Sequence, residues 1–181
     1  WVAIDRAIKI AKIVGKKEEV KKWNPIQIAI KNDIETNAWN EKVKAYTQSY
    51  GSDYLDASVL LIEQYGFIKA KEERYISTVN AIERELAFDG LLYRYKNRDD
   101  FGLPTSSFTV CTFWFIKSLI KIGQFKKAKK YFDNLLNYSN HLGLFSEDID
   151  FKTKRLLGTF PQAYSHLALI DTALSFNSPV E

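Results

Sequence analysis

The stretch GLFSEDID (143–150) carries three carboxylates, Glu147, Asp148 and Asp150, within four positions. It is followed by GTFPQAYSHLALI (158–170), an almost uncharged run that is typical of a buried helix. Charge is usually kept away from such an entry into a core, because an unpaired ion loses its hydration there. The acidic stretch is therefore a solvated loop, a metal cage, or the working acid or base of an enzyme.

A metal cage does not fit the pattern of this stretch. It lacks the glycine turn and the later bidentate glutamate of a calcium loop, and no pairing of cysteine with histidine indicates zinc. Cys111 stands alone in the apolar run FTVCTFWFI (108–116), which predicts a buried free thiol and not a nucleophile. We interpret His141 and His166 as structural, and we expect no metal and no cofactor.

Other residues that could do chemistry lie in the loops that enter the most apolar segments. Arg94 is flanked by Tyr93 and Tyr95, Phe108 enters one apolar segment, and Tyr164 enters another. Aromatic rings cover the C–H faces of a sugar, and guanidinium donors satisfy its hydroxyls. Carboxylates can then serve as acid and base for the glycosidic bond. Together these residue types favour a carbohydrate site.

Each of these residues also has a structural interpretation. Spacing alone favours a surface-loop carboxylate for Glu147, since loops are commonly acidic. Arg94 has Asp99 and Asp100 nearby as ion-pair partners. Trp114 lies in the middle of an apolar segment, which favours packing in the core over stacking on a sugar. Residue type and spacing alone leave these alternatives open.

Helical periodicity dominates the chain, and no segment shows sustained strand alternation. The pattern predicts seven helices, at 1–15, Glu18–Trp39, Leu55–Tyr65, Glu72–Phe88, Ser106–Ile122, Phe125–Tyr138 and Pro161–Phe176. Pro25 indicates a late start or an irregularity in the second helix, and Pro161 fits the first turn of the last. The second, fourth and sixth helices have charged backs, whereas the fifth and seventh are apolar almost all round. This alternation predicts a double ring, in which outer helices wrap an inner set.

Length and composition limit the class of protein. The 181 residues, 46% of them hydrophobic, predict one domain with a sizeable core. The net charge is +4, yet Lys126, Lys127, Lys129 and Lys130 fall on the wet face of one helix, so we expect no nucleic-acid partner. No uncharged run is long enough to predict a membrane span. A single thiol without a disulfide framework is compatible with the cytoplasm, where we expect the protein.

Several motifs, in this order along the chain, resemble those of the glucoamylase/trehalase-like glycoside hydrolases, family fifteen. They are WVAIDRAI at the start, YLDASVLL (54–61), LLYRY (91–95), FTVCTFWFI (108–116), GLFSEDID (143–150) and LLGTFPQAYSHLALI (156–170). Together they cover essentially the whole chain. The resemblance implies an all-α fold, an incomplete (α/α)6 barrel to which the predicted helices contribute the last seven, alternating outer and inner.

The resemblance also implies an inverting, exo-acting α-glucosidase of the glucoamylase or trehalase type. In that mechanism one carboxylic acid protonates the leaving oxygen while a carboxylate activates water on the opposite face, about 6.5–9.5 Å away. By the motifs, Glu147 matches the general base and Arg94 matches an arginine that holds sugar hydroxyls. Phe108 and Tyr164 match aromatic walls of the pocket. Asp56 falls at a comparable pocket-facing helix start, where helix capping is the simpler interpretation.

The remaining carboxylates of the acidic stretch match neighbours without assigned chemistry. We expect Asp148 and Asp150 to cap the loop or to be solvated. Many relatives have an acidic residue and a glycine where this chain reads TSSF (105–108). Because of this difference, the sequence does not define the side of the pocket that binds the leaving group. The choice between an oligosaccharide and a disaccharide substrate therefore stays open.

The chain opens on Trp1 and contains no methionine, which predicts a piece of a longer protein. The family's general acid lies in a glutamate-containing loop just ahead of the helix that begins here. We therefore expect residues 1–181 to be the C-terminal part of one catalytic domain. Its partner would be the missing N-terminal half of the same protein, and the fragment alone would be inactive, with inner helices partly uncovered. A non-catalytic helical scaffold that binds sugar or a protein partner is the rival hypothesis.

Overall fold

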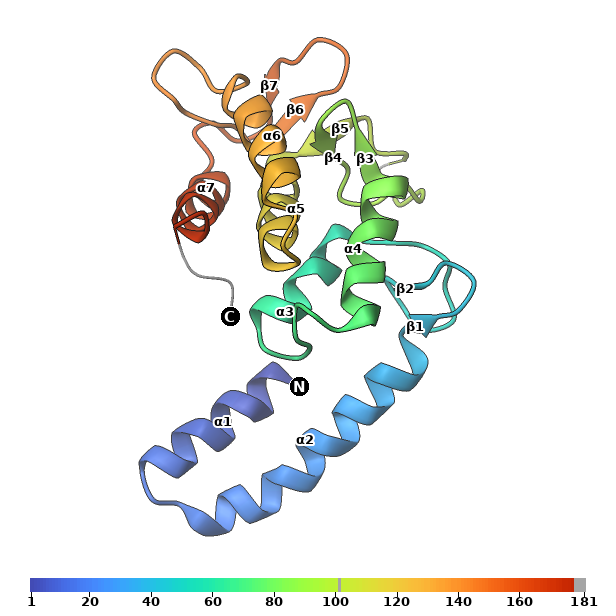
Figure 1. Cartoon of the computed structure of the whole chain (residues 1–181), viewed down its shortest axis with the longest axis vertical. Coiled ribbons are helices and arrows are strands. Elements are labelled where there is room, and N and C mark those ends of the chain that lie inside the picture. The colour runs from blue at the N-terminus through green and yellow to red at the C-terminus, as the bar shows by residue number, and fades with distance from the viewer. Residues whose placement is uncertain (101, 178–181) are drawn as a thin grey trace.

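The computed structural model describes residues 1–100 and 102–177, which form mainly α-helices (Figure 1). In chain order the helices are α1 (Val2–Ile13), α2 (Lys17–Asn37), the 3₁₀ helix η1 (Ala57–Leu60), α3 (Leu61–Gln64), α4 (Glu73–Leu86), α5 (Thr109–Lys121), α6 (Phe125–Leu136) and α7 (Ala163–Ser175). The prediction of seven α-helices is confirmed for this part of the chain.

Short strands, which the sequence did not predict, join the helices. They are β1 (Trp39–Asn40), β2 (Ala45–Tyr46), β3 (Ala87–Phe88), β4 (Leu91–Leu92), β5 (Ser106–Phe108), β6 (Asp148–Asp150) and β7 (Leu156–Leu157). β1 pairs with β2, β3 pairs with β4, and β5, β6 and β7 form a three-stranded antiparallel sheet with β6 in the middle. Strands of two or three residues are too short to show a period of two, so periodicity could not reveal them.

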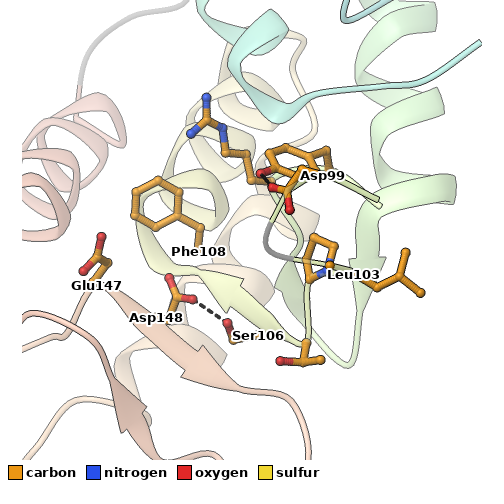
Figure 2. Close-up of a pocket in the computed structure, with 11 residues that line it drawn as sticks. Asp99, Leu103, Ser106, Phe108, Glu147 and Asp148 are labelled. Atoms are coloured by element: carbon orange, nitrogen blue, oxygen red, sulfur yellow. Dashed lines mark hydrogen bonds between the residues drawn. The ribbon is translucent and has the colours of Figure 1, made fainter. Parts of the chain in front are cut away.

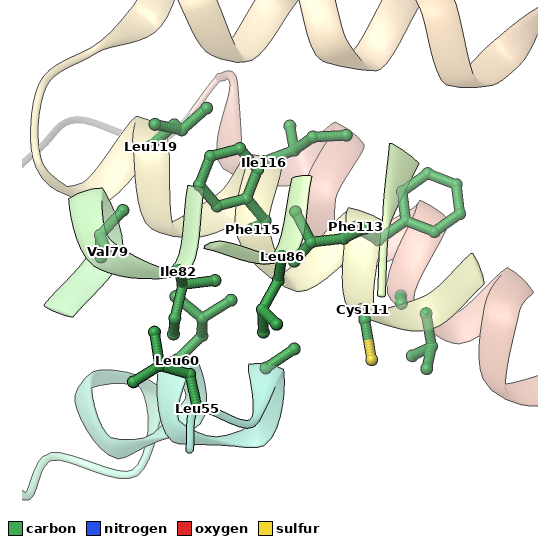
Figure 3. Close-up of a cluster of buried hydrophobic side chains, with 14 of the residues drawn as sticks. Leu55, Leu60, Val79, Ile82, Leu86, Cys111, Phe113, Phe115, Ile116 and Leu119 are labelled. Atoms are coloured by element: carbon green, nitrogen blue, oxygen red, sulfur yellow. The ribbon is translucent and has the colours of Figure 1, made fainter. Parts of the chain in front are cut away.

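Helix α5 is the centre of the core. It lies between α4, α6 and α7 (Figure 1), and most of its side chains are buried, as the largely apolar sequence predicted. One stripe of the helix, Trp114, Lys117 and Lys121, is only half-buried. Phe113, Phe115 and Leu119 are fully buried. Figure 3 shows side chains of α5 packed against those of α4 and η1. A buried tyrosine of α4, Tyr75, joins these elements, because its hydroxyl donates to the Leu60 carbonyl oxygen at 3.0 Å and lies 2.9 Å from Ser118 Oγ.

Helices α1 and α2 form an antiparallel pair that projects from the rest of the molecule (Figure 1). The prediction of a late start or an irregularity at Pro25 is wrong, since α2 begins at Lys17 and continues through the proline. The missing N–H of Pro25 costs one backbone hydrogen bond, and a helix of 21 residues tolerates that loss. Although α2 is the longest helix, neither it nor any other described helix combines the length and apolar character that a bilayer crossing needs.

Two predicted helix boundaries are also corrected. The third predicted helix, 55–65, is only the short pair η1 and α3, because Asp56 caps it at one end and Gly66, at φ +80°, ends it at the other. Pro161 is not in a first helical turn. It follows a cis peptide bond with Phe160, and α7 begins at Ala163 with Gln162 as its cap.

Helix α7 buries only its small and polar side chains. The buried residues are Ser165, Ala168, Thr172 and Ser175. Leu167 and Ile170 on its other side are 65% and 56% exposed, and Tyr164 in the first turn is 66% exposed. The predicted partly uncovered inner face is therefore confirmed for α7. On α5 it is limited to the half-buried stripe of Trp114, Lys117 and Lys121.

Candidate active site

A cavity of about 540 Å³ lies between the segment that follows β4 and the edge of the β5–β6 sheet. Its size is within the range of about 300–1,000 Å³ that is usual for small-ligand sites. Residues of 94–106 form one part of the lining, and Phe108, Glu147 and Asp148 form the other. Figure 2 shows Glu147, Asp148, Ser106 and Phe108 around this cavity, with Asp99 and Leu103 on the loop that completes it. Three residues predicted from the sequence, Arg94, Phe108 and Glu147, thus share one cavity.

The register of β5 and β6 explains how the sheet presents these side chains. Phe108 is opposite Asp148, and Ser107 is opposite Ile149. Successive side chains of a strand point to opposite faces. Ser107 and Ile149 are fully buried on the core face, so Phe108 and Asp148 share the other face with Ser106 and border the cavity. The prediction that a helix begins at Ser106 is wrong, and the strand formed there is what aims Phe108.

Glu147 directly precedes β6 and is held by backbone groups. Its carbonyl oxygen accepts a hydrogen bond from Thr109 N–H at 2.9 Å, which satisfies a free amide at the start of α5. Its own N–H donates to the Thr159 carbonyl oxygen at 2.9 Å, and Thr159 N–H donates to Glu147 Oε2 at 3.1 Å. The half-buried side chain is therefore fixed from two segments and not free in bulk solvent.

The start of α7 supports the residues just before Glu147. Gln162 N–H donates to the Phe145 carbonyl oxygen at 2.9 Å, and the Ser165 hydroxyl donates to the Ser146 carbonyl oxygen at 2.9 Å. His166 Nε2 accepts from Phe145 N–H at 3.3 Å, while Nδ1 lies 2.7 Å from the Gln162 carbonyl oxygen, as in a neutral ring protonated on Nδ1. The structural interpretation of His166 is confirmed, and its role is to position the acidic stretch.

Arg94 reaches the cavity from the segment after β4 and pairs with Asp56. Its Nε lies 3.6 Å from Asp56 Oδ2, and its carbonyl oxygen accepts from Ala57 N–H at 2.8 Å. Asp56 is buried and its Oδ1 accepts from Ser58 N–H at 2.7 Å, so the predicted helix cap is confirmed. Asp56 does not line the cavity, and it contributes to the site through its ion pair with Arg94.

Tyr164, like Asp56, is a predicted site residue that does not line the cavity. Its side chain is mostly exposed on the face of α7 that carries Leu167 and Ile170. Its backbone N–H donates to Gln162 Oε1 at 2.7 Å, which is part of the helix cap. A contact between Tyr164 and sugar stays a prediction.

The sequence profile of the family described as Glycosyl hydrolases family 15 matches residues 1–174, almost the whole chain. The chain belongs to glycosyl hydrolase family 15. The predicted resemblance is therefore confirmed.

Curated relatives agree with family 15 membership. The chain is 43% identical over 175 residues to a trehalase of Thermoplasma acidophilum, and 39% identical over 177 residues to a trehalase of Mycobacterium tuberculosis. These matches cover 96% of this chain but only 30% and 26% of the two relatives. The chain thus spans less than a third of the length of either enzyme.

Solved structures establish the fold of this family 15 chain. A glycosidase variant in complex with glucose superposes with a TM-score of 0.74 at 16% identity, over 87% of this chain and 44% of that one. The wild-type glycosidase superposes with a TM-score of 0.71 at 15% identity. The predicted fold class is confirmed: the chain is mainly helical and forms part of an (α/α)6 barrel.

The other two carboxylates of the acidic stretch have different surroundings. Asp150 accepts from Lys152 N–H, Thr153 N–H and the Thr153 hydroxyl, so its predicted role in capping the loop is confirmed. These hydrogen bonds, chiefly those from Thr153, lower the pKa of Asp150. Asp148 is half-buried in the cavity wall and accepts from the Ser106 hydroxyl, so its prediction as a loop cap or solvated group is wrong.

Burial raises the pKa of the Asp148 carboxyl above its ordinary value. The hydrogen bond from Ser106 opposes this rise, and the charge of neighbouring Glu147 adds to it. The native protein therefore holds this proton to higher pH than the unfolded chain does. Sequence reasoning missed Asp148, because a carboxylate on a three-residue strand gives no signal of which face it occupies.

Asp148 and Asp150 are expected to affect stability with opposite signs. A raised native pKa means that ionisation of Asp148 disfavours folding. The stabilisation of the fold by protonated Asp148 is therefore lost as the pH rises through its native pKa. Asp148→Asn should therefore raise the melting temperature at about pH 7, by a few degrees, and change it little at about pH 3. Asp150, whose pKa is lowered, stabilises the fold when ionised, so Asp150→Asn should lower the melting temperature at about pH 7. Calorimetry across this pH range measures both, and equal signs for the two variants would contradict the assignment.

The other candidate groups do not supply chemistry. Cys111 is a fully buried free thiol, as predicted, and burial raises its pKa well above the ordinary value, so it is not a thiolate near neutral pH. Trp114 packs against the core, as predicted. Within residues 1–100 and 102–177, no group of three or more His, Cys, Asp or Glu residues is arranged to hold a metal ion.

Proposed function

We propose that the protein carrying this chain is an inverting α-glucosidase that hydrolyses trehalose, with Glu147 as its general base. The observation that carries the proposal is the cavity shared by Glu147, Arg94 and Phe108. Trehalase relatives with 39–43% identity favour trehalose over an α-linked glucan as the substrate. A carboxylate, an arginine and an aromatic ring are together suited to the binding of a sugar and the hydrolysis of its glycosidic bond.

Each group has a distinct role in the proposed reaction. Glu147 accepts a proton from a water molecule as the water oxygen attacks the anomeric carbon, and the bond from this carbon to the bridging oxygen breaks. Arg94, supported by Asp56 at 3.6 Å, donates to sugar hydroxyls and so orients the ring. Phe108 covers an apolar face of the sugar. The proton for the departing glucose comes from an acid that we place in the protein outside this chain.

The exposed face of α7 supports the proposal that further protein completes the site. Tyr164, Leu167 and Ile170 form an apolar surface on this helix, whose buried side faces the core. Large exposed apolar surfaces of this kind mark contacts with other protein. We place the missing part of the same barrel against this surface, where it also brings neighbours to Tyr164. The isolated chain, which would lack the acid, is then inactive.

The configuration of the released glucose tests the proposed mechanism. Full-length protein is mixed with trehalose, and ¹H NMR spectra are recorded before mutarotation mixes the anomers. Inversion at one of the two α-linked carbons gives α-glucose and β-glucose in equal amounts, because the departing ring keeps its configuration. Formation of α-glucose alone would mean retention and would exclude this mechanism. Absence of hydrolysis of trehalose, maltose and isomaltose would favour the non-catalytic scaffold.

A further inference from the structure

Asp148 has the position of a ligand-binding group and is not used by the proposed reaction. It is on the cavity face of β6, opposite Phe108 and next to Glu147. Figure 2 shows its side chain between those of Glu147 and Ser106, with the Ser106 hydrogen bond drawn. Both strands of this face thus contribute a polar group to the cavity wall.

The hydrogen bonding of Asp148 leaves one acceptor for a ligand. Ser106 Oγ donates to Asp148 Oδ2 and fixes the orientation of the carboxyl group. Among the described residues, no donor forms a hydrogen bond with Oδ1. Oδ1 is also not a fully buried atom, because it is absent from the set of buried polar atoms without a partner. Oδ1 therefore meets the contents of the cavity.

The chemistry of the cavity wall is complementary to a hydroxylated ligand. Arg94 is only a donor, so it can satisfy hydroxyl oxygens but not hydroxyl hydrogens. A sugar hydroxyl is both donor and acceptor, and its hydrogen requires an acceptor on the protein. Glu147 is engaged by Thr159 N–H and, in the proposed reaction, by the attacking water. Two other carboxylates line the cavity, and one of them, Asp99, accepts from the Tyr95 hydroxyl on its own loop. Asp148, on the sheet face next to Glu147, is the carboxylate placed for this purpose.

We infer that Asp148, oriented by Ser106, accepts a hydrogen bond from one hydroxyl of the glucose ring that Glu147 serves, and so selects for that hydroxyl. This inference depends on the proposed function, because it assigns a ligand group within the same site. Burial and the charge of Glu147 raise the pKa of Asp148, which means that the carboxylate lacks full hydration in the empty site. A hydroxyl donor in the cavity replaces part of that hydration.

The inference is tested by calorimetric titration of the full-length protein with D-glucose and its 2-, 3-, 4- and 6-deoxy analogues. For the wild type, removal of the recognised hydroxyl should weaken binding by about tenfold or more, as for a hydrogen bond to a charged group. In Asp148→Asn, glucose should bind about tenfold more weakly, and the same deoxy analogue should bind as well as glucose. Ser106→Ala should show an intermediate loss for that analogue. Asp150→Asn, on the same strand but outside the cavity lining, is the matched control.

Each outcome of the titration has one meaning. If the wild-type protein binds no glucose, the proposed function itself is contradicted. Wild-type protein that binds glucose, together with an Asp148→Asn variant whose selectivity for all four analogues is unchanged, removes only the role of Asp148. If Asp148→Asn binds glucose normally and hydrolyses α-glucosyl fluoride normally but fails on trehalose, Asp148 acts on the leaving group, which also overturns the inference.

Discussion

Glu147→Gln in the full-length protein is expected to lower kcat for trehalose by about 10²–10⁴-fold, the usual contribution of a general base. Glutamine has the same shape and can still accept the Thr159 N–H that reaches Oε2 at 3.1 Å. The cavity and the Thr109 and Thr159 backbone contacts should therefore persist, and KM should change little. Steady-state kinetics give kcat and KM separately. An unchanged kcat would show that Glu147 is not the base.

Chemical rescue separates a lost base from a lost structure. Glu147→Ala leaves space beside the anomeric carbon, and azide placed there can attack this carbon without a base. With α-glucosyl fluoride as substrate, fluoride departs, and inversion by azide gives β-glucosyl azide. Asp150→Asn, which keeps the fold of the same strand, should give ordinary hydrolysis and no azide product. A damaged site would produce neither activity.

The helices of this chain could be predicted because their signals are local. Helix α5 is largely apolar and largely buried, and α4 and α6 each have a charged, solvent-facing side, as outer helices do. Helix α7 has the same apolar composition as α5, yet Leu167 and Ile170 are exposed. The sequence of a helix shows which of its faces is apolar and must be buried against other residues. It does not specify whether the same chain supplies it.

The strands that build the site could not be predicted from the sequence. β5 and β6 gain their geometry from pairing between segments about 40 residues apart, such as Phe108 with Asp148. No local pattern encodes that pairing. β6 and β7 pair locally, but strands of two or three residues are too short to show a period of two. The β3–β4 hairpin does have a local signal, because Asp89 and Gly90 have positive φ and an Asp-Gly pair between apolar residues favours a tight turn.

The site could be predicted in part. The motifs that resemble family fifteen named Glu147, Arg94 and Phe108, and these three line one cavity. Asp56 is close to Arg94 through an ion pair across 38 residues of sequence, which only the fold reveals. Asp148 was missed because its place in the cavity depends on which face of β6 its side chain occupies. Gly158 and Thr159 were missed because their contribution is made by the backbone.

Gly158 is the residue that lets the polypeptide approach Glu147. Its φ is +73°, a backbone conformation that residues with a side chain rarely adopt. A Cβ added there would lie 2.8 Å from Glu147 Oε2 and 3.1 Å from Glu147 Cβ. Because the neighbouring Thr159 N–H holds the same carboxylate oxygen, a methyl group at 158 must displace either the carboxylate or the segment after β7 that holds it.

Gly158→Ala is therefore expected to lower kcat by about 10²-fold, as a misplaced reacting group does, and to destabilise the fold by about 1–2 kcal/mol through backbone strain. Gly143→Ala is the matched control, since Gly143 has φ +75° but no atom within 4 Å of the added Cβ. It should lose similar stability in urea unfolding and keep its kcat. If both alanine variants lose activity equally, strain alone explains the loss, and the close approach at 158 does not position Glu147. If only Gly158→Ala loses activity, the position of the carboxylate, and not the stability of the loop, sets the rate.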